Sequence, residues 1–64
     1  MSQMLVGIDV SLRSHHVHFM HGEGHTLADF SVQNDVKGAD TLIQKIVRTA
    51  EKNQTDQLKI GMEA

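Results

Sequence analysis

The chain has 64 residues, of which 39% are hydrophobic and none is cysteine. A chain of this length forms one domain or part of one, because folding buries only about 60% of its extended-chain surface. The lack of cysteine excludes a disulfide framework and a thiolate zinc site. No apolar run approaches the ~20 residues that span a bilayer, so a cytoplasmic protein with no membrane partner is expected. The formal net charge is −2, whereas a domain that binds nucleic acid by itself is usually basic. Binding of DNA or RNA would therefore require metal ions or additional parts of the protein.

Alternating apolar and polar residues predict three consecutive strands in the first half of the chain. The expected strands are Met4–Ser11, His15–His21 and Thr26–Gln33. In the first strand, Val6 and Ile8 share one face, while Gly7 and Asp9 share the other. The Gly22–Gly24 segment tolerates positive φ and can reverse the chain into the third strand. The pattern therefore predicts an antiparallel meander.

The second half changes to helical spacing and then returns to alternation. A helix of about four turns is predicted from an apolar stripe that consists of Val36, Ala39, Leu42, Ile43, Ile46, Val47 and Ala50. Asn34 or Asp35 can cap its start, and Gly38 in the first turn weakens its propensity. A fourth strand follows, with Leu58, Ile60, Met62 and Ala64 on one face and Lys59, Gly61 and Glu63 on the other.

The order β-β-β-α-β predicts an α/β fold with one mixed sheet. A helix that joins two strands usually makes them parallel, through a right-handed crossover. The fourth strand should lie beside the first, which gives the strand order 3-2-1-4. The helix is expected to cover the apolar face, including that of the fourth strand, and to leave the opposite face polar.

Asp9 and Glu63 are the candidate site residues, because the face assignment puts both acids on the side away from the helix. Gly7 and Gly61 on the same face leave room for a ligand. Two adjacent carboxylates repel each other unless a proton or cation lies between them, and an all-oxygen pair suits Mg²⁺ or Mn²⁺. Two such ions support phosphodiester displacement. The alternative is an Asp9 that caps or forms a salt bridge and a merely solvated Glu63.

Histidines are concentrated in the predicted hairpin, at His15, His16, His18, His21 and His25. Imidazole is a common ligand of transition metals, but alternation divides these residues between two faces. We therefore interpret them as exposed hairpin histidines, with His16 and His18 on the face of Asp9. Arg13 in the first turn is interpreted as an exposed arginine rather than a phosphate ligand.

The segments Leu5–Ser11, Asn34–Gly38 and Ile60–Ala64, with the long strand-turn-strand between them, resemble the opening of certain bacterial insertion-sequence transposases. These are the Piv-like, bridge-RNA-guided enzymes. Their N-terminal catalytic domain is RuvC-like and carries a DEDD tetrad on a ribonuclease H fold. The resemblance runs essentially from end to end of the chain.

The resemblance implies that Asp9 and Glu63 are the first two acids of the tetrad and ligands of catalytic Mg²⁺ or Mn²⁺. Two further aspartates and a domain with a nucleophilic serine would lie beyond Ala64, so residues 1–64 are expected to be the N-terminal part of the catalytic domain. The parent protein is then expected to cleave and join DNA, with DNA and a guide RNA as partners. The 64-residue chain alone has an incomplete two-ion site and is expected to be inactive.

Two alternatives stay open at this point. Actin-like and sugar-kinase-like ATPases also open with a glycine-isoleucine-aspartate strand, although Ser11-Leu12-Arg13 stands where they usually carry Gly-Thr or Gly-Ser. A non-enzymatic oligomerisation module is the other alternative. A homo-oligomer is expected in any case, because the edge of the fourth strand and the uncovered sheet face favour self-association.

Overall fold

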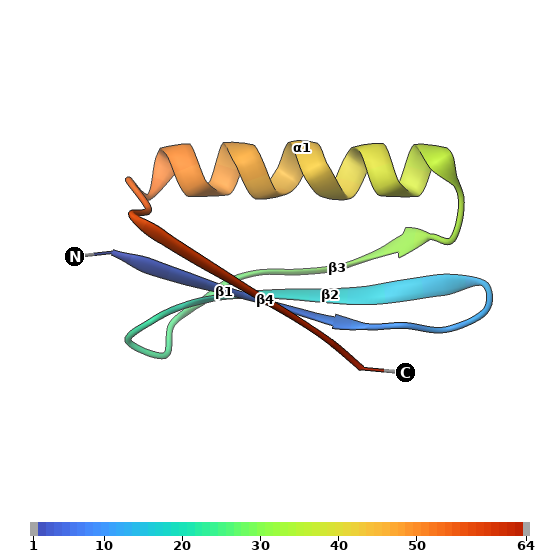
Figure 1. Cartoon of the computed structure of the whole chain (residues 1–64), viewed down its shortest axis with the longest axis horizontal. Helices are drawn as coiled ribbons and strands as arrows, with labels where there is room; N and C mark the ends of the chain where they lie inside the picture. Colours follow the sequence, from blue (N-terminus) through green and yellow to red (C-terminus); the bar gives the residue numbers. More distant parts are fainter. Residues whose placement is uncertain (1, 64) are drawn as a thin grey trace.

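The computed structural model, which describes residues 2–63, consists of one four-stranded sheet and one helix (Figure 1). The elements are β1 (Gln3–Asp9), β2 (Ser14–His21), β3 (Thr26–Gln33), α1 (Val36–Lys52) and β4 (Gln57–Glu63). The strand order is β3-β2-β1-β4. β1 is antiparallel to β2 and parallel to β4. The predicted mixed sheet and its ribonuclease H-like strand order are confirmed.

The hydrophobic core lies on the face of the sheet toward α1. Its buried residues are Met4, Val6, Ile8, Val17, Phe19 and Val32, and the helix adds Leu42, Ile46 and Ala50 at its border. The ring of Phe19 packs edge-on against Phe30, with centroids 5.2 Å apart. From α1, the Nζ of Lys45 lies 4.7 Å from the centroid of the Phe30 ring. A cation in this position is attracted by the ring face, so Lys45 helps to hold α1 on the sheet.

The expectation that the helix covers β4 is wrong. Among the described residues, α1 packs mainly on β3, the strand that precedes it (Figure 1). Several side chains predicted for the core are therefore exposed, namely Val36, Ile43, Val47, Leu58, Ile60 and Met62. A helix about 10 Å wide cannot cover four strands spaced about 4.8 Å apart. Ala64, which was assigned to the same face, lies outside the described residues.

The two candidate cap residues of α1 have different roles. Asp35 is the N-cap, and its Oδ1 accepts a hydrogen bond of 2.7 Å from the backbone N–H of Gly38. Asn34 instead holds the turn between β1 and β2. Its backbone N–H donates to the carbonyl of Arg13 at 2.9 Å, and its Nδ2 donates to the carbonyl of Leu12 at 3.1 Å. The start of the helix is thereby tied to the tip of the first hairpin.

Gly38 is required by close packing, which its low helix propensity does not reveal. A Cβ at this position would lie 1.8 Å from the carbonyl oxygen of Gln33. Because the Gln33 atoms in the way belong to the backbone, a side chain at this position could fit only if α1 moved away from β3. The glycine therefore sets how closely the helix approaches the sheet.

We expect Gly38→Ala to lower the free energy of unfolding by roughly 2 kcal/mol, a typical cost of overpacking. That is a large part of the roughly 3–10 kcal/mol expected for a chain of this size. The matched control is Gly61→Ala, because no atom lies within 4 Å of the Cβ it adds. Urea unfolding followed by circular dichroism measures both. Equal stability of Gly38→Ala and Gly61→Ala would contradict this account of the helix contact.

Candidate active site

The parallel register of β1 and β4 brings the two predicted acids together. Backbone hydrogen bonds anchor the pair of strands at both ends. At the start, the carbonyl of Ser2 accepts from Asp56 N at 2.8 Å, and at the end Val10 N donates to the carbonyl of Glu63 at 2.7 Å. Between these anchors, Asp9 lies directly opposite Glu63. Neighbouring strands are about 4.8 Å apart, so the carboxylates extend from adjacent backbone positions.

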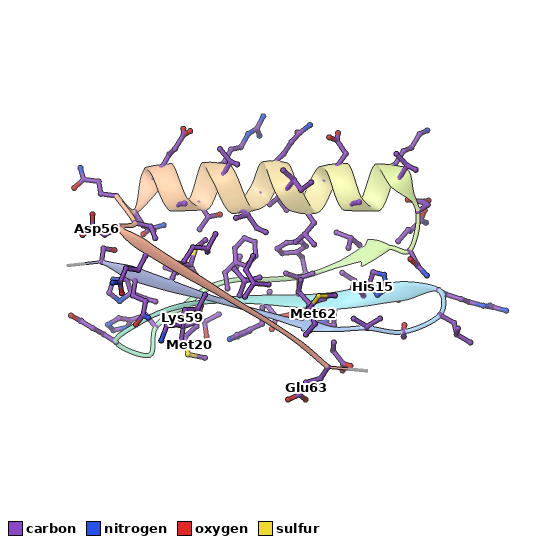
Figure 2. The ribbon with its side chains drawn as sticks, viewed as in Figure 1. His15, Met20, Asp56, Lys59, Met62 and Glu63 are labelled. Atoms are coloured by element: carbon purple, nitrogen blue, oxygen red, sulfur yellow. The ribbon has the colours of Figure 1, made fainter. Side chains whose placement is uncertain are left out.

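Both acids line one open groove on the face away from α1. The groove has a volume of about 400 Å³. It is lined by two glycines, two acids, two histidines and two apolar residues, namely Gly7, Gly61, Asp9, Glu63, His16, His18, Ile8 and Met62. Figure 2 shows the side chain of Glu63 extending from the sheet on the side opposite the helix. The predicted placement of Asp9 and Glu63 on one face is therefore what the structure shows.

The two glycines of the groove face each other across β1 and β4. Gly7 is the register partner of Gly61, one row before the two acids. A Cβ on Gly61 would meet no atom within 4 Å, and one on Gly7 would meet only the carbonyl oxygen of His18 at 4.0 Å. The space above them is therefore open. A ligand can approach the backbone here, as the sequence predicted.

The charge of the groove is dominated by acids. Within residues 2–63, the close contacts between an acid and a basic or histidine side chain are those that join Asp29 to His16 and to His18. Asp9 and Glu63 thus have no basic partner in the described part of the chain. The interpretation of Asp9 as a structural salt-bridge residue is not supported by these contacts. Two unpaired carboxylates side by side attract a cation.

The donor set fits a hard divalent cation in composition. Mg²⁺ is usually bound through one or two carboxylates together with water and substrate phosphates, rather than by a cage made only of protein. No cluster of three or more His, Cys, Asp or Glu residues suitable for a metal ion is found over residues 2–63. In the described part of the chain, Asp9 and Glu63 are thus two candidate carboxylate ligands.

The five histidines fall into separate groups. His16 and His18 border the groove, while the His15 ring accepts a hydrogen bond from Ser11 N at 3.2 Å. The rings of His21 and His25 lie at the turn between β2 and β3, with centroids 6.1 Å apart and planes tilted by 55°. Over residues 2–63, no group of three or more possible metal ligands includes these histidines.

Asp29 contacts two histidines of the groove, a link that the sequence interpretation missed. It lies on β3, opposite His18. Its Oδ1 is 2.5 Å from Nε2 of His16, and its Oδ2 is 3.2 Å from Nδ1 of His18. The sequence did contain a signal for this contact. Asp29 lies on the polar face of its predicted strand, and His16 and His18 lie on the polar face of the strand before it.

We expect Asp9→Asn to stabilise the protein in metal-free buffer, because like charges directly opposite each other in a sheet are destabilising. The gain should be on the order of 0.5 kcal/mol in the free energy of unfolding. Asp56→Asn is the control. Oδ2 of Asp56 accepts a hydrogen bond of 3.2 Å from Ser2 N, so its neutralisation should bring no gain. Unchanged or reduced stability of Asp9→Asn, measured by urea unfolding, would show that the acids do not repel each other.

Comparison with known proteins agrees with the geometry. A family model described as a transposase, DEDD_Tnp_IS110, matches residues 6–64. The match includes both acids, both groove glycines, β1 from Val6 onward and the four elements that follow it. Among curated proteins and solved structures, none matches the chain significantly. Because the family model covers nearly the whole sequence, the chain belongs to the IS110 group of DEDD transposases.

Proposed function

We propose that residues 1–64 are the N-terminal part of a RuvC-like catalytic domain, in which Asp9 and Glu63 bind the divalent cation used in DNA cleavage and joining. The observation that carries this proposal is the direct pairing of two carboxylates without basic partners on neighbouring parallel strands of a transposase-family chain. Acids on adjacent strands keep a fixed spacing, because the sheet itself sets it.

The acids and the glycines of the groove have different roles in binding. Asp9 and Glu63 supply the negative charge that holds the cation, and Gly7 and Gly61 leave the approach to it open. When bound, Mg²⁺ or Mn²⁺ would activate an attacking oxygen and stabilise the leaving oxygen of a phosphodiester. The remaining ligands would come from water, from substrate and from the two further aspartates that the resemblance implies.

Membership of a transposase family supports a wider proposal for the parent protein. We propose DNA as the substrate of the parent protein, a guide RNA as its second partner, and the cytoplasm as its place of action. The 64-residue chain by itself is proposed to be inactive, because two ligands make an incomplete site. Within residues 2–63, no helix is long and apolar enough to cross a membrane. Self-association of the chain stays a prediction, which light scattering coupled to size exclusion tests.

The ATPase alternative is less well supported by the first turn. A phosphate-binding hairpin of that kind needs backbone N–H groups free to face phosphate. The backbone N–H of Ser11 already donates to Nδ1 of His15, and the Ser11 hydroxyl bonds to the carbonyl of Ser14. The polar groups of Ser11 are thus already hydrogen-bonded to residues of the same hairpin.

Titration with Mn²⁺ followed by NMR line broadening tests the proposal. We expect broadening centred on Asp9 and Glu63, with affinity reduced roughly tenfold or more in Asp9→Asn and in Glu63→Gln, because each removes a charged ligand. Asp40→Asn is the matched control. Its carboxylate lies on α1, where Oδ2 accepts from Nε2 of Gln44 at 3.0 Å.

The other outcomes separate the alternatives. Broadening centred on His21 and His25, or an equal loss of affinity in Asp40→Asn, contradicts a carboxylate metal site. Shifts caused by ATP around Ser11–Ser14 favour the ATPase alternative. A chain that responds to neither Mn²⁺ nor ATP favours an oligomerisation module.

A further inference from the structure

One carboxylate joins two imidazoles along the wall of the groove. His16 and His18 point from β2 to the same face, and Asp29 reaches both from β3. His18 is the direct register partner of Asp29, whereas His16 is its diagonal neighbour, beside Ser31. Cross-strand pairs of this kind contribute only about 0.2–1 kcal/mol to stability. Stability alone is therefore a weak reason for orienting two rings beside two unpaired acids.

The bonding of His18 leaves one ring nitrogen for a ligand. A carboxylate only accepts hydrogen bonds, so the contact of 3.2 Å with Oδ2 of Asp29 places a proton on Nδ1 of His18. His16 differs, because its Nε2 contacts Asp29 while its Nδ1 lies 3.4 Å from Oγ of Ser31. Within residues 2–63, Nε2 of His18 has no hydrogen-bond partner, although the residue lines the groove.

The strand register puts His18 where a ligand has room. Across the sheet its neighbours in the same row are Gly7 on β1 and Gly61 on β4, neither of which carries a side chain. The next row contains His16, Asp9 and Glu63. A group bound over the glycines would therefore contact the carboxylate pair on one side and the His18 ring on another.

We propose that His18 contacts a phosphate oxygen of the nucleic acid in this groove, and that Asp29 is the positioning residue that turns its Nε2 toward it. This inference rests on the proposed function, because it takes the groove as the site of a phosphodiester. When both ring nitrogens carry protons, Nδ1 donates to Asp29 and Nε2 donates to the phosphate oxygen.

The charges around the groove make such a donor useful. Asp9 and Glu63 repel a phosphodiester until a cation neutralises them, and Asp29 adds a third carboxylate behind the groove histidines that it contacts. His16 and His18 are the groove residues that can offset Asp29. The cation and the imidazoles would thus neutralise different acids.

The test is an NMR titration of the 64-residue chain with a short single-stranded oligodeoxynucleotide in the presence of Mg²⁺. We expect the ring resonances of His18 to shift and both of its ring nitrogens to become protonated. His18→Gln should weaken binding about tenfold, the usual effect of losing a charge-assisted hydrogen bond. His25→Gln is the matched control, because this exposed histidine of the same hairpin lies outside the groove.

Variants of Asp29 test positioning separately from binding. Asp29→Ala should remove the preference for the Nδ1-protonated form of His18 in the free protein, seen in long-range ¹H–¹⁵N spectra, and Asp29→Glu should restore part of it. A merely structural Asp29 would change stability but not this ring signature.

Several results would overturn the inference. They are an unshifted His18 ring up to millimolar oligonucleotide, equal losses in His18→Gln and His25→Gln, and an unchanged ring signature in Asp29→Ala. Failure of the proposed function is recognised independently, because the Mn²⁺ titration then shows no broadening at Asp9 and Glu63. Broadening there without any response of His18 rejects the histidine contact alone.

Discussion

The parallel hydrogen bonding between β1 and β4 is the contact on which the candidate site depends. These strands are far apart in sequence, and α1 brings them together by carrying the chain back to the start of β1. Once the carbonyl of Ser2 accepts from Asp56 and Gln57, the register of the remaining residues follows. A shift by one residue would turn Glu63 to the opposite face and away from Asp9. The pairing of the acids is thus a consequence of strand register rather than of any contact between their side chains.

The same register explains why the site is open. Gly7 and Gly61 are partners, so the row beside the acids has no side chains on β1 or β4. Glycine within a strand weakens it, because it has no side chain to pack and loses more backbone entropy on folding. Here that loss accompanies a groove bordered by two carboxylates and two imidazoles, with Asp29 in contact with both imidazoles. Acids on β1 and β4 would hold a cation, and the acid on β3 orients histidines on β2.

The two periodicities of the sequence and the order of the segments that carry them were sufficient to predict the type and order of the elements, the strand order and the common face of Asp9 and Glu63. These features depend on period and chain order, which the sequence carries directly. The extent of helix cover was not predictable in this way. Exposure of Ile60 and Met62 depends on where α1 lies across the width of the sheet, and the apolar stripe of the helix contains no such information. The pairing of Asp29 with two histidines likewise depends on the register between β2 and β3.

Two residues of α1 have roles that helix propensity and helical periodicity do not indicate. Gly38 counts against a helix when only its backbone freedom is considered, yet the carbonyl of Gln33 occupies the place of its Cβ. Lys45 belongs to the polar face of the helix by periodicity, yet its long side chain reaches the ring of Phe30. Both effects arise from contacts between α1 and β3, which appear only when the helix is placed on the sheet.

Anomalous X-ray scattering from crystals of the protein grown with Mn²⁺ tests the central claim most directly. The account predicts a manganese peak in the groove between the carboxylates of Asp9 and Glu63, with Gly7 and Gly61 beside it. A peak bound by hairpin histidines alone, or electron density that places Asp9 and Glu63 on opposite faces of the sheet, would contradict it.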